Sequence, residues 1–318
     1  MKSEERIRNA ERLTTLHFGR EKRQIFAPIY LGNHCINDCT YCGFRKGNRD
    51  VVRTSLTPSE AAEEARFLVA SGVGRILVLA GELPEGGYID WFCDCLRSIH
   101  SVPGVSWIGV ELAPLSHGGY LQLLDAGADA FIVFQETYSD TCYSRAHKGR
   151  GPKEDFHHRY RSTFEAAEAG FKEIGLGVLL GLSDPSIDVS AMIRHGERIL
   201  ENYPNVLLRC SFPRFRPAKG SLLSESPVPV TEEDILAGIV EVRTSLPRSR
   251  IALTARESTS FRLSVMGIAT DFGAGGSTTV GGYVSRSTSS SSEQFPLLET
   301  SSAEEFKRAA SAHGFTLG

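Results

Sequence analysis

Short apolar runs alternate with longer amphipathic stretches along most of the chain. The runs have the length of buried strands, and the stretches between them have the apolar spacing of helices. Eight runs are predicted to be strands: 25–31, 75–80, 106–112, 130–134, 173–179, 206–210, 250–254 and 268–272. Strands that alternate with helices in this way are typical of repeated βα units and a parallel sheet.

Two of the expected helices have clear starting signals. Thr57 followed by Pro58 provides an N-cap and a proline in the first turn, and Thr231 precedes acidic residues. Eight βα units in 318 residues predict an α/β fold, a (β/α)8 TIM-type barrel. A six-unit partial barrel with an irregular C-terminal part is the alternative. Residues 1–24 are predicted to be an N-terminal helical segment, and residues 25–318 the barrel with a C-terminal segment that closes it.

The composition argues against several classes of protein. Hydrophobic residues make up 41% of the chain, and the net charge of −3 gives no strong field toward nucleic acids or membranes. No apolar run approaches the roughly 20 residues that span a bilayer, and the charged N-terminus lacks a signal-peptide core. We therefore expect a cytoplasmic protein with no nucleic-acid or membrane partner, and a flexible serine-rich loop at 285–292.

Three cysteines lie close together after the first predicted strand. Cys35, Cys39 and Cys42 have the spacing C-x3-C-x2-C, and three thiolates on one loop can hold three irons of a four-iron, four-sulfur cluster. The fourth iron would keep an open position for chemistry. A disulfide with one spare thiol and a zinc site that uses His34 are the alternatives, but no second cysteine pair has a suitable spacing. The remaining cysteines are scattered and look ordinary: Cys93, Cys95, Cys142 and Cys210.

Polar and glycine residues also follow the other predicted strands. In a parallel barrel the carboxyl ends of the strands meet at one face, where active sites are built. The sequence therefore predicts a site at this face that combines the cysteine loop with later segments. These segments include Gly81-Glu82, Glu111, Gln135-Glu136-Thr137, Pro213 to Pro217, Arg256-Glu257 and Gly273 to Ser277.

The cysteine loop, with Tyr41 directly before its last cysteine, resembles the radical S-adenosylmethionine (SAM) superfamily. The resemblance implies two cofactors, one 4Fe-4S cluster and SAM. In this superfamily the amino acid part of SAM binds the open iron, and one electron from the cluster yields a 5′-deoxyadenosyl radical. Ala80-Gly81-Glu82 is similar to the Gly-Gly-Glu motif that binds the ammonium group of SAM, with Ala80 in place of the first glycine. A plain turn is the alternative for Gly81 and Glu82.

Four further residues are candidates for SAM binding. Arg159 can grip the carboxylate of SAM with its guanidinium, although an exposed helix arginine would look the same in sequence. Glu136 is a candidate for the ribose or the amino group, with helix capping as the alternative. Tyr41 is expected near the adenine. Gly177 lies in a glycine-containing strand that would let the adenine approach the backbone, unless these glycines serve packing.

Several motifs resemble the aromatic amino acid lyase branch of the superfamily more closely. The resemblance runs in order from about Ile25 to the C-terminus. In these motifs the chain is similar to the 2-iminoacetate synthase family, the tyrosine lyases of thiamine biosynthesis. It is also similar to the tyrosine lyases that mature [FeFe]-hydrogenase. The motifs are Phe134 to Tyr138 with Tyr143 and His147, Ile174 to Gly177, Gly181 to Asp184, Ser211 to Pro217, Thr254 to Ser258, and Gly281 to Tyr283 with Gln294 and Phe295.

This resemblance implies a reaction and partners. A hydrogen atom is taken from the amino group of L-tyrosine, and the Cα–Cβ bond then breaks to give 2-iminoacetate (dehydroglycine) and p-cresol. The imine would supply the thiazole of thiamine, so thiazole synthase is an expected partner. An external one-electron donor such as flavodoxin or ferredoxin is also implied.

Substrate-binding residues follow from the same resemblance. Arg256 is expected to bind the amino acid carboxylate, and Ser277 to form part of a nest with neighbouring glycines. Arg214 and Arg216 are secondary candidates, for which a salt bridge at the barrel rim is the alternative. A group of histidines is expected to consist of solvated helix residues: His147, His157 and His158.

Two departures keep other activities open. No cysteine follows Cys210, which argues against the second cluster of a hydrogenase maturase. A biotin-synthase-like sulfur insertion enzyme would need a second cluster inside the barrel, and the remaining four cysteines do not clearly show its pattern. Gly273 opens a loop that commonly reads Ser-Ala-Gly-Ser in tyrosine lyases, so a side-chain donor near the substrate is expected to be missing. A lyase for another amino acid such as L-tryptophan, a hydrogenase-maturation-related paralogue and a non-enzymatic iron–sulfur scaffold are the remaining alternatives.

Overall fold

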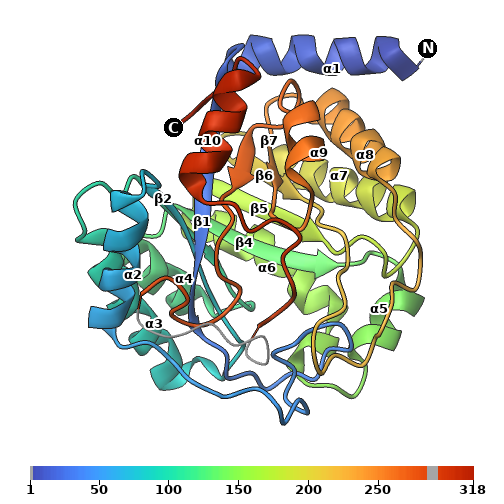
Figure 1. Cartoon of the computed structure of the whole chain (residues 1–318). Helices are drawn as coiled ribbons and strands as arrows, with labels where there is room; N and C mark the ends of the chain where they lie inside the picture. Colours follow the sequence, from blue (N-terminus) through green and yellow to red (C-terminus); the bar gives the residue numbers. More distant parts are fainter. Residues whose placement is uncertain (1–2, 285–292) are drawn as a thin grey trace.

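The protein forms a closed barrel of eight parallel strands (Figure 1). The computed structural model describes residues 3–284 and 293–318, so the predicted loop at 285–292 lies outside the described residues. The strands pair in sequence order, and β1 pairs with both β2 and β8, which closes the barrel. The strands are β1 (Lys22–Gly32), β2 (Arg75–Ala80), β3 (Trp107–Glu111), β4 (Ala130–Glu136), β5 (Glu173–Val178), β6 (Leu207–Ser211), β7 (Arg250–Leu253) and β8 (Asp271–Gly273).

The predicted (β/α)8 fold is confirmed, and each predicted strand overlaps a real one. One strand was missed: β9 (Thr316–Leu317) pairs in parallel with Lys22 and Arg23 at the start of β1. A strand of two residues is too short to show an alternation of apolar and polar residues. Its pairing depends on the return of the C-terminal segment to the barrel. The predicted division at residue 24 falls within β1, and that division remains a prediction.

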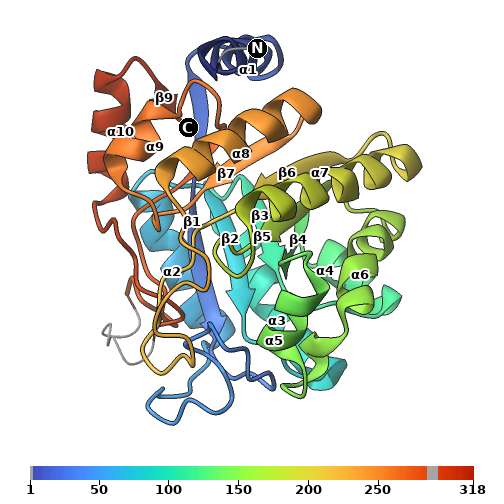
Figure 2. The ribbon, with the colours of Figure 1, turned by 90° about the vertical axis from the view of Figure 1, so that its right-hand side faces the viewer.

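Helices cover the outside of the barrel, as Figures 1 and 2 show. The expected starting signals are real, since the Thr57 and Thr231 side chains each form a capping box at the first turn of a helix. The helices are α1 (Ser3–Phe18), α2 (Pro58–Ala70), α3 (Glu85–His100), α4 (His117–Asp125), α5 (Asp140–His147), α6 (Phe156–Ala169), α7 (Pro185–Asn202), α8 (Glu232–Ser245), α9 (Thr259–Ser264) and α10 (Ala303–Ala312), with a 3₁₀ turn η1 (Pro152–Glu154). No helix among the described residues is long and apolar enough to cross a membrane.

A network of charged side chains fills the barrel near the amino ends of the strands. Arg209 donates to Glu173 at 2.6 Å and to Asp271 at 2.9 Å, and Arg250 donates to Asp271 at 3.3 Å. The guanidinium of Arg209 also stacks over the Trp107 ring at 4.7 Å. These contacts fill this end of the barrel, so the space for a ligand lies toward the opposite, carboxyl end.

The long loop between β1 and α2 covers the carboxyl end. Arg53 holds its two branches together, because its guanidinium donates to the carbonyl of Asn33 and to those of Phe44 at 2.8 Å and Arg45 at 2.7 Å. Multiple hydrogen bonds from one arginine fix the path of a loop that has no regular structure of its own. The three neighbouring cysteines are carried on this loop.

Candidate active site

The three motif cysteines are free thiols on the loop that follows β1. Burial raises the pKa of Cys39 to about 11 and that of Cys42 to about 12, and the neighbouring cysteines of the motif contribute to both increases. The Sγ atom of Cys42 accepts a hydrogen bond from the backbone N–H of Phe44 at 3.4 Å. Buried thiols that repel one another as thiolates need cations for full deprotonation, which bound iron would supply.

The loop after β2 packs directly against the cysteine loop. A Cβ atom added to Gly81 would lie 2.2 Å from the carbonyl oxygen of His34 and 3.1 Å from Cβ of Cys35. The backbone N–H of Ile36 donates to the carbonyl of Glu82 at 2.9 Å. Glycine at position 81 is therefore required by the close approach, which brings Glu82 next to the cysteines.

The cysteine loop fits a four-iron cluster better than a single metal ion. Within residues 3–284 and 293–318, no three cysteine, histidine or carboxylate side chains converge to hold one ion. In a four-iron cluster each cysteine binds a different iron, so its ligands stand further apart than those of a single ion. The electrostatic coupling of Cys42 to Cys39 and Cys35 shows that the three thiols share one region.

Arg159 on α6 points toward this region. Its Nε atom donates to the carbonyl of Phe134 at 2.6 Å, and its Nη1 atom lies 3.9 Å from a carboxylate oxygen of Glu82. This Nη1 atom is buried without a hydrogen-bond partner in the described part of the chain. The exposed-arginine alternative is therefore wrong, since Arg159 is only 7% exposed. Its role toward SAM remains a prediction.

Glu136 occupies a strained backbone position at the end of β4. Its φ of +69° is the one positive value among the described residues other than glycine, and the β4–β5 register shifts at this point. Such strain concentrates at functional sites. A carboxylate oxygen of Glu136 accepts from the ammonium of Lys153 at 2.6 Å. Burial and Arg159 lower the pKa of Lys153, but attraction to Glu136 and Cys39 outweighs them and the pKa lies above its ordinary value.

Tyr41 is hydrogen-bonded to His147, which was expected to be a solvated helix residue. Its hydroxyl group forms a hydrogen bond with Nε2 of His147 at 2.9 Å, and His147 is fully buried. Burial lowers the pKa of His147 to about 2, so the imidazole is neutral. The expectation of a solvated helix residue is wrong here because α5 turns this face toward the cysteine loop, while His157 on α6 is exposed.

Packing accounts for Gly177 in β5. A Cβ atom there would lie 2.4 Å from the ring of Phe134, so the glycine leaves room for that ring. A Cβ atom on Gly175 would likewise lie 2.4 Å from the side chain of Ile132. These contacts support the packing alternative and give no support to an adenine contact, which remains a prediction.

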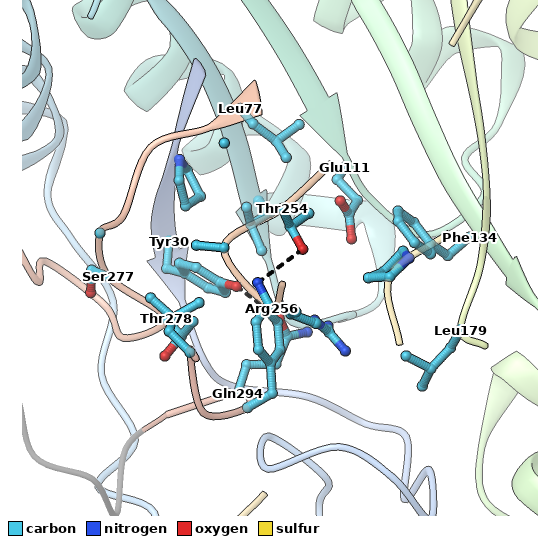
Figure 3. Close-up of a pocket in the computed structure, with 18 of the residues that line it drawn as sticks. Tyr30, Leu77, Glu111, Phe134, Leu179, Thr254, Arg256, Ser277, Thr278 and Gln294 are labelled. Carbon is cyan, nitrogen blue, oxygen red and sulfur yellow. Dashed lines mark hydrogen bonds between the residues drawn. The ribbon is translucent and has the colours of Figure 1, made fainter. Parts of the chain in front are cut away.

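A largely apolar cavity opens at the carboxyl end of the barrel (Figure 3). Its empty volume, including the part open to solvent, is about 910 Å³. It extends to Tyr41 and Cys42 of the cysteine loop and to Glu136. Its apolar wall is formed by Phe26, Pro28, Leu77, Leu79, Phe134, Leu179, Phe295 and Leu297.

Arg256 lies in this cavity, as Figure 3 shows. Its guanidinium carbon stacks 3.4 Å from the centre of the Phe295 ring, and its Nε atom is buried without a hydrogen-bond partner in the described residues. Burial lowers the pKa of Arg256, yet a guanidinium remains charged at neutral pH. A half-buried cation with an unused buried donor is suited to a carboxylate ligand.

The other three substrate candidates have partners within the protein. Arg214 pairs with Glu257, its Nε atom lying 3.0 Å and 3.1 Å from the two carboxylate oxygens. Arg216 donates to the backbone carbonyl of Arg256 at 3.0 Å. Neither arginine lines the cavity, and the salt-bridge alternative describes Arg214. Ser277 does line the cavity, but its hydroxyl group is bonded to Thr279 at 2.9 Å.

The glycines of the loop after β8 differ in what they permit. A Cβ atom on Gly273 would meet its nearest neighbour, Cα of Thr254, at an ordinary 3.4 Å, so the position has room for a Cβ atom. A Cβ atom on Gly276 would lie 2.4 Å from the hydroxyl of Tyr283, which donates to the carbonyl of Pro28 at 3.0 Å. Glycine at 276 is thus required by Tyr283, whereas glycine at 273 is not required by sterics.

Sequence reasoning assigned no role to two charged residues of this site. Glu111 was expected at the carboxyl face because it ends a strand, and it does line the cavity. Lys153 lies in the 3₁₀ turn before α6 and reaches Glu136 across 17 residues of sequence. No local signal marks such a lysine, because its position depends on how η1 folds back over β4.

Two family models together match most of the chain. The family model of the radical SAM superfamily matches residues 29–192, and that of the biotin and thiamin synthesis associated domain matches residues 211–316. The chain belongs to the radical SAM superfamily, in the branch that holds the 2-iminoacetate synthases. Members of this superfamily use a 4Fe-4S cluster and SAM, a small-molecule substrate and an external electron donor, and the protein is a radical SAM enzyme.

Three relatives place the chain within this branch. It is 33% identical to a 2-iminoacetate synthase of Escherichia coli, over 88% of this chain and 73% of that protein. It is 32% identical to a 2-iminoacetate synthase of Salmonella typhimurium, over 94% and 76% of the two chains. The solved structure of the FeFe-hydrogenase maturase HydG from Carboxydothermus hydrogenoformans matches with a TM-score of 0.90 and 30% identity, over 98% of this chain and 71% of that chain.

Proposed function

We propose that this enzyme cleaves the Cα–Cβ bond of L-tyrosine to give 2-iminoacetate and p-cresol, for the thiazole of thiamine. One observation carries the proposal: Arg256, whose buried Nε atom has no hydrogen-bond partner in the described part of the chain, lies in an apolar cavity that reaches Cys42 of the cysteine loop. An amino acid held there by its carboxylate would lie beside the cluster and SAM. The similarity to 2-iminoacetate synthases over about three quarters of their length supports the same reaction.

The chain's own residues fit both cofactors. Cys35, Cys39 and Cys42 would bind three irons, and the N–H of Phe44 would stabilise the thiolate of Cys42. When bound, the cluster and SAM supply the 5′-deoxyadenosyl radical that removes a hydrogen atom from the substrate. The protein orients the groups around this event and limits the access of water to the cavity.

SAM would be held by groups of opposite charge near the cysteine loop. Gly81 and Glu82 would accept the ammonium group of SAM, and the unused donor of Arg159 would bind its carboxylate. The salt bridge between Glu136 and Lys153 fixes a carboxylate at the cavity wall for the ribose or amino group. Tyr41, held by His147, would lie against the adenine.

The substrate would be held at both of its ends. Arg256 would bind the carboxylate, and the apolar wall would surround the aromatic ring and exclude water from it. Residues 25–318 would provide these contacts, with residues 1–24 as an accessory helical segment. The partners would be flavodoxin or ferredoxin as the electron donor, and thiazole synthase as the acceptor of the unstable imine.

The test is an anaerobic assay of cluster-reconstituted protein with SAM, a reductant and L-tyrosine. We expect p-cresol and 5′-deoxyadenosine to form in step. Formation of 5′-deoxyadenosine without p-cresol would contradict tyrosine as the substrate, and L-tryptophan would then be tested with its own cleavage product. A protein that makes neither product after iron incorporation would contradict the lyase reaction altogether.

A further inference from the structure

Glu111 is a cavity carboxylate to which neither the motifs nor the mechanism above assign a function. It is the last residue of β3, and Figure 3 shows its carboxylate pointing into the same cavity that contains Arg256 and Thr254. Glu111 therefore faces the space in which an amino acid bound to Arg256 would lie.

Glu111 is half-buried, and it differs from the buried carboxylates of the barrel because it lacks a partner. Glu136 binds Lys153, Glu257 binds Arg214 and Glu173 binds Arg209. The Glu111 side chain forms no hydrogen bond or ion pair with any of the residues that the structure describes. An unpaired carboxylate in an apolar cavity is costly, so a position of this kind is expected where a ligand supplies the missing partner.

The charges around Glu111 come from several elements. Burial and the neighbouring Glu136 raise the pKa of Glu111 to about 7, while Arg256, Lys153 and Arg159 oppose the increase. Glu111 in turn contributes to the raised pKa of Tyr30 on β1. Lys153 is already bound to Glu136, so it is not free to neutralise Glu111.

We propose that Glu111 binds the α-ammonium group of the substrate amino acid and accepts its proton. This inference rests on the proposed function, in which Arg256 binds the carboxylate one carbon away from that ammonium. An N–H bond of the ammonium breaks, its electron pair stays on nitrogen, and a new O–H bond forms on Glu111. No oxidant or further reactant is needed, and the product is the neutral amine from which a hydrogen atom is then removed.

A carboxyl group with a pKa near 7 suits this exchange. At neutral pH an appreciable fraction is ionised and ready to accept a proton, and a general base works best when its pKa lies near the working pH. A carboxylate with an ordinary pKa would be a much weaker base toward an ammonium group. The cavity thus supplies one group for each charge of an amino acid, Arg256 for the anion and Glu111 for the cation.

Ligand affinities separate the ammonium role from other roles. The reconstituted enzyme with SAM would be titrated with L-tyrosine, with 3-(4-hydroxyphenyl)propanoate, which lacks the ammonium, and with L-phenylalanine, which lacks the hydroxyl. In the unchanged enzyme we expect loss of the ammonium to weaken binding at least about tenfold, as for a charged hydrogen bond. In Glu111→Gln this ratio should fall to within about twofold, while the tyrosine-to-phenylalanine ratio stays constant.

Two controls accompany the titrations. Glu168→Gln removes a carboxylate from the exposed face of α6 and should leave both ratios unchanged. Glu111→Asp keeps the charge and should retain part of the ammonium preference, and it replaces Glu111→Gln should that variant fail to fold. If Glu111→Gln changes the phenylalanine ratio instead, Glu111 binds the phenol and the proposal is wrong. Unchanged ratios would overturn it as well.

The pH dependence of a single turnover tests the proton transfer itself. Formation of p-cresol should rise with pH through about 7 in the unchanged enzyme and in Glu111→Asp. In Glu111→Gln it should be at least tenfold lower and lack this rise, while 5′-deoxyadenosine still forms. If the unchanged enzyme makes no p-cresol but shows the ammonium preference, the proposed function fails and the binding role of Glu111 stands. If p-cresol forms at equal rates with the same pH profile in Glu111→Gln, only this inference fails.

Discussion

The two ends of the barrel use the same residue types in opposite ways. At the amino end Arg209 is bound to Glu173 and Asp271, and Asp271 also binds Arg250. At the carboxyl end Arg256 keeps a buried nitrogen without a hydrogen-bond partner among the described residues. An arginine nitrogen without such a partner also occurs at the amino end, on Arg250, but there the guanidinium pairs with Asp271, whereas no carboxylate of the described residues pairs with Arg256.

The pKa values express this difference. Burial raises the pKa of Asp271, but Arg209 and Arg250 outweigh burial and hold it below its ordinary value. Burial also raises the pKa of Glu111, and there the neighbouring cations do not compensate, so the value is about 7. A buried charge is tolerated where the protein pairs it. The incomplete pairing at the carboxyl end is what a charged ligand would complete.

The largest expected effect is the loss of chemistry at the carboxyl end without loss of the fold. Cys39→Ala should lower bound iron and reduce SAM cleavage at least about a hundredfold, because one iron loses its thiolate. Iron analysis and 5′-deoxyadenosine formation measure the effect. Cys142→Ala, a cysteine outside the motif, is the matched control and should retain both. Full SAM cleavage by Cys39→Ala would refute the cluster assignment.

The second prediction concerns the loss of the charged network at the amino end. Arg209→Ala leaves Glu173 and Asp271 without their shared cation, and breaking a buried ion pair costs about 3–5 kcal/mol. The free energy of unfolding from urea titration should fall by that amount. The variant molecules that still fold should bind SAM with an affinity close to that of the unchanged protein. If Arg209→Ala were as stable as the unchanged protein, the network would not be needed to maintain this end of the barrel.

The third prediction is the counterpart at the carboxyl end. Arg256→Ala should raise the apparent Michaelis constant for the amino acid at least about tenfold, because a charged hydrogen bond to the substrate is lost. The free energy of unfolding should change by less than about 1 kcal/mol, since the arginine has few partners to leave unpaired. An unchanged Michaelis constant would contradict the role of Arg256, and uncoupled SAM cleavage should persist.

The fourth prediction compares two glycines of the loop after β8. Gly276→Ser should destabilise the fold by about 1–3 kcal/mol, because its Cβ would overlap the Tyr283 hydroxyl. Gly273→Ser should be tolerated within about 0.5 kcal/mol and place a hydroxyl at the cavity wall. Thermal unfolding of both variants checks this contrast. Equal destabilisation would show that Gly273 is also required by packing.

The smallest effect concerns stability and pH at Glu111. Its folded pKa of about 7 lies above the ordinary value of 4.5, so the folded state binds more protons between these values and stability falls as pH rises through about 7. The stability that proton binding by Glu111 contributes is fully present below pH 4.5. In the cluster-free protein, Glu111→Gln should gain at least about 1 kcal/mol relative to the unchanged protein between pH 5 and pH 8. Parallel stability curves would contradict the raised pKa.

Much of the fold was predictable because its signals are local. The length and spacing of apolar runs predicted all eight barrel strands, since a strand buried on both sides needs a continuous apolar run. The N-caps at Thr57 and Thr231 were predictable for the same reason, because a cap involves residues only three positions apart. The strand β9 was missed because two residues carry no pattern.

The sequence by itself determined the barrel, the cysteine loop and the face at which polar residues collect, because each depends on spacing within a short segment. Only the tertiary structure decided which of these residues have partners. It paired Arg214 with Glu257 and buried His147 against Tyr41, while Arg256 and Glu111 stayed open to the cavity. Such pairings join residues tens to hundreds of positions apart, and burial then fixes the charge that each side chain can carry.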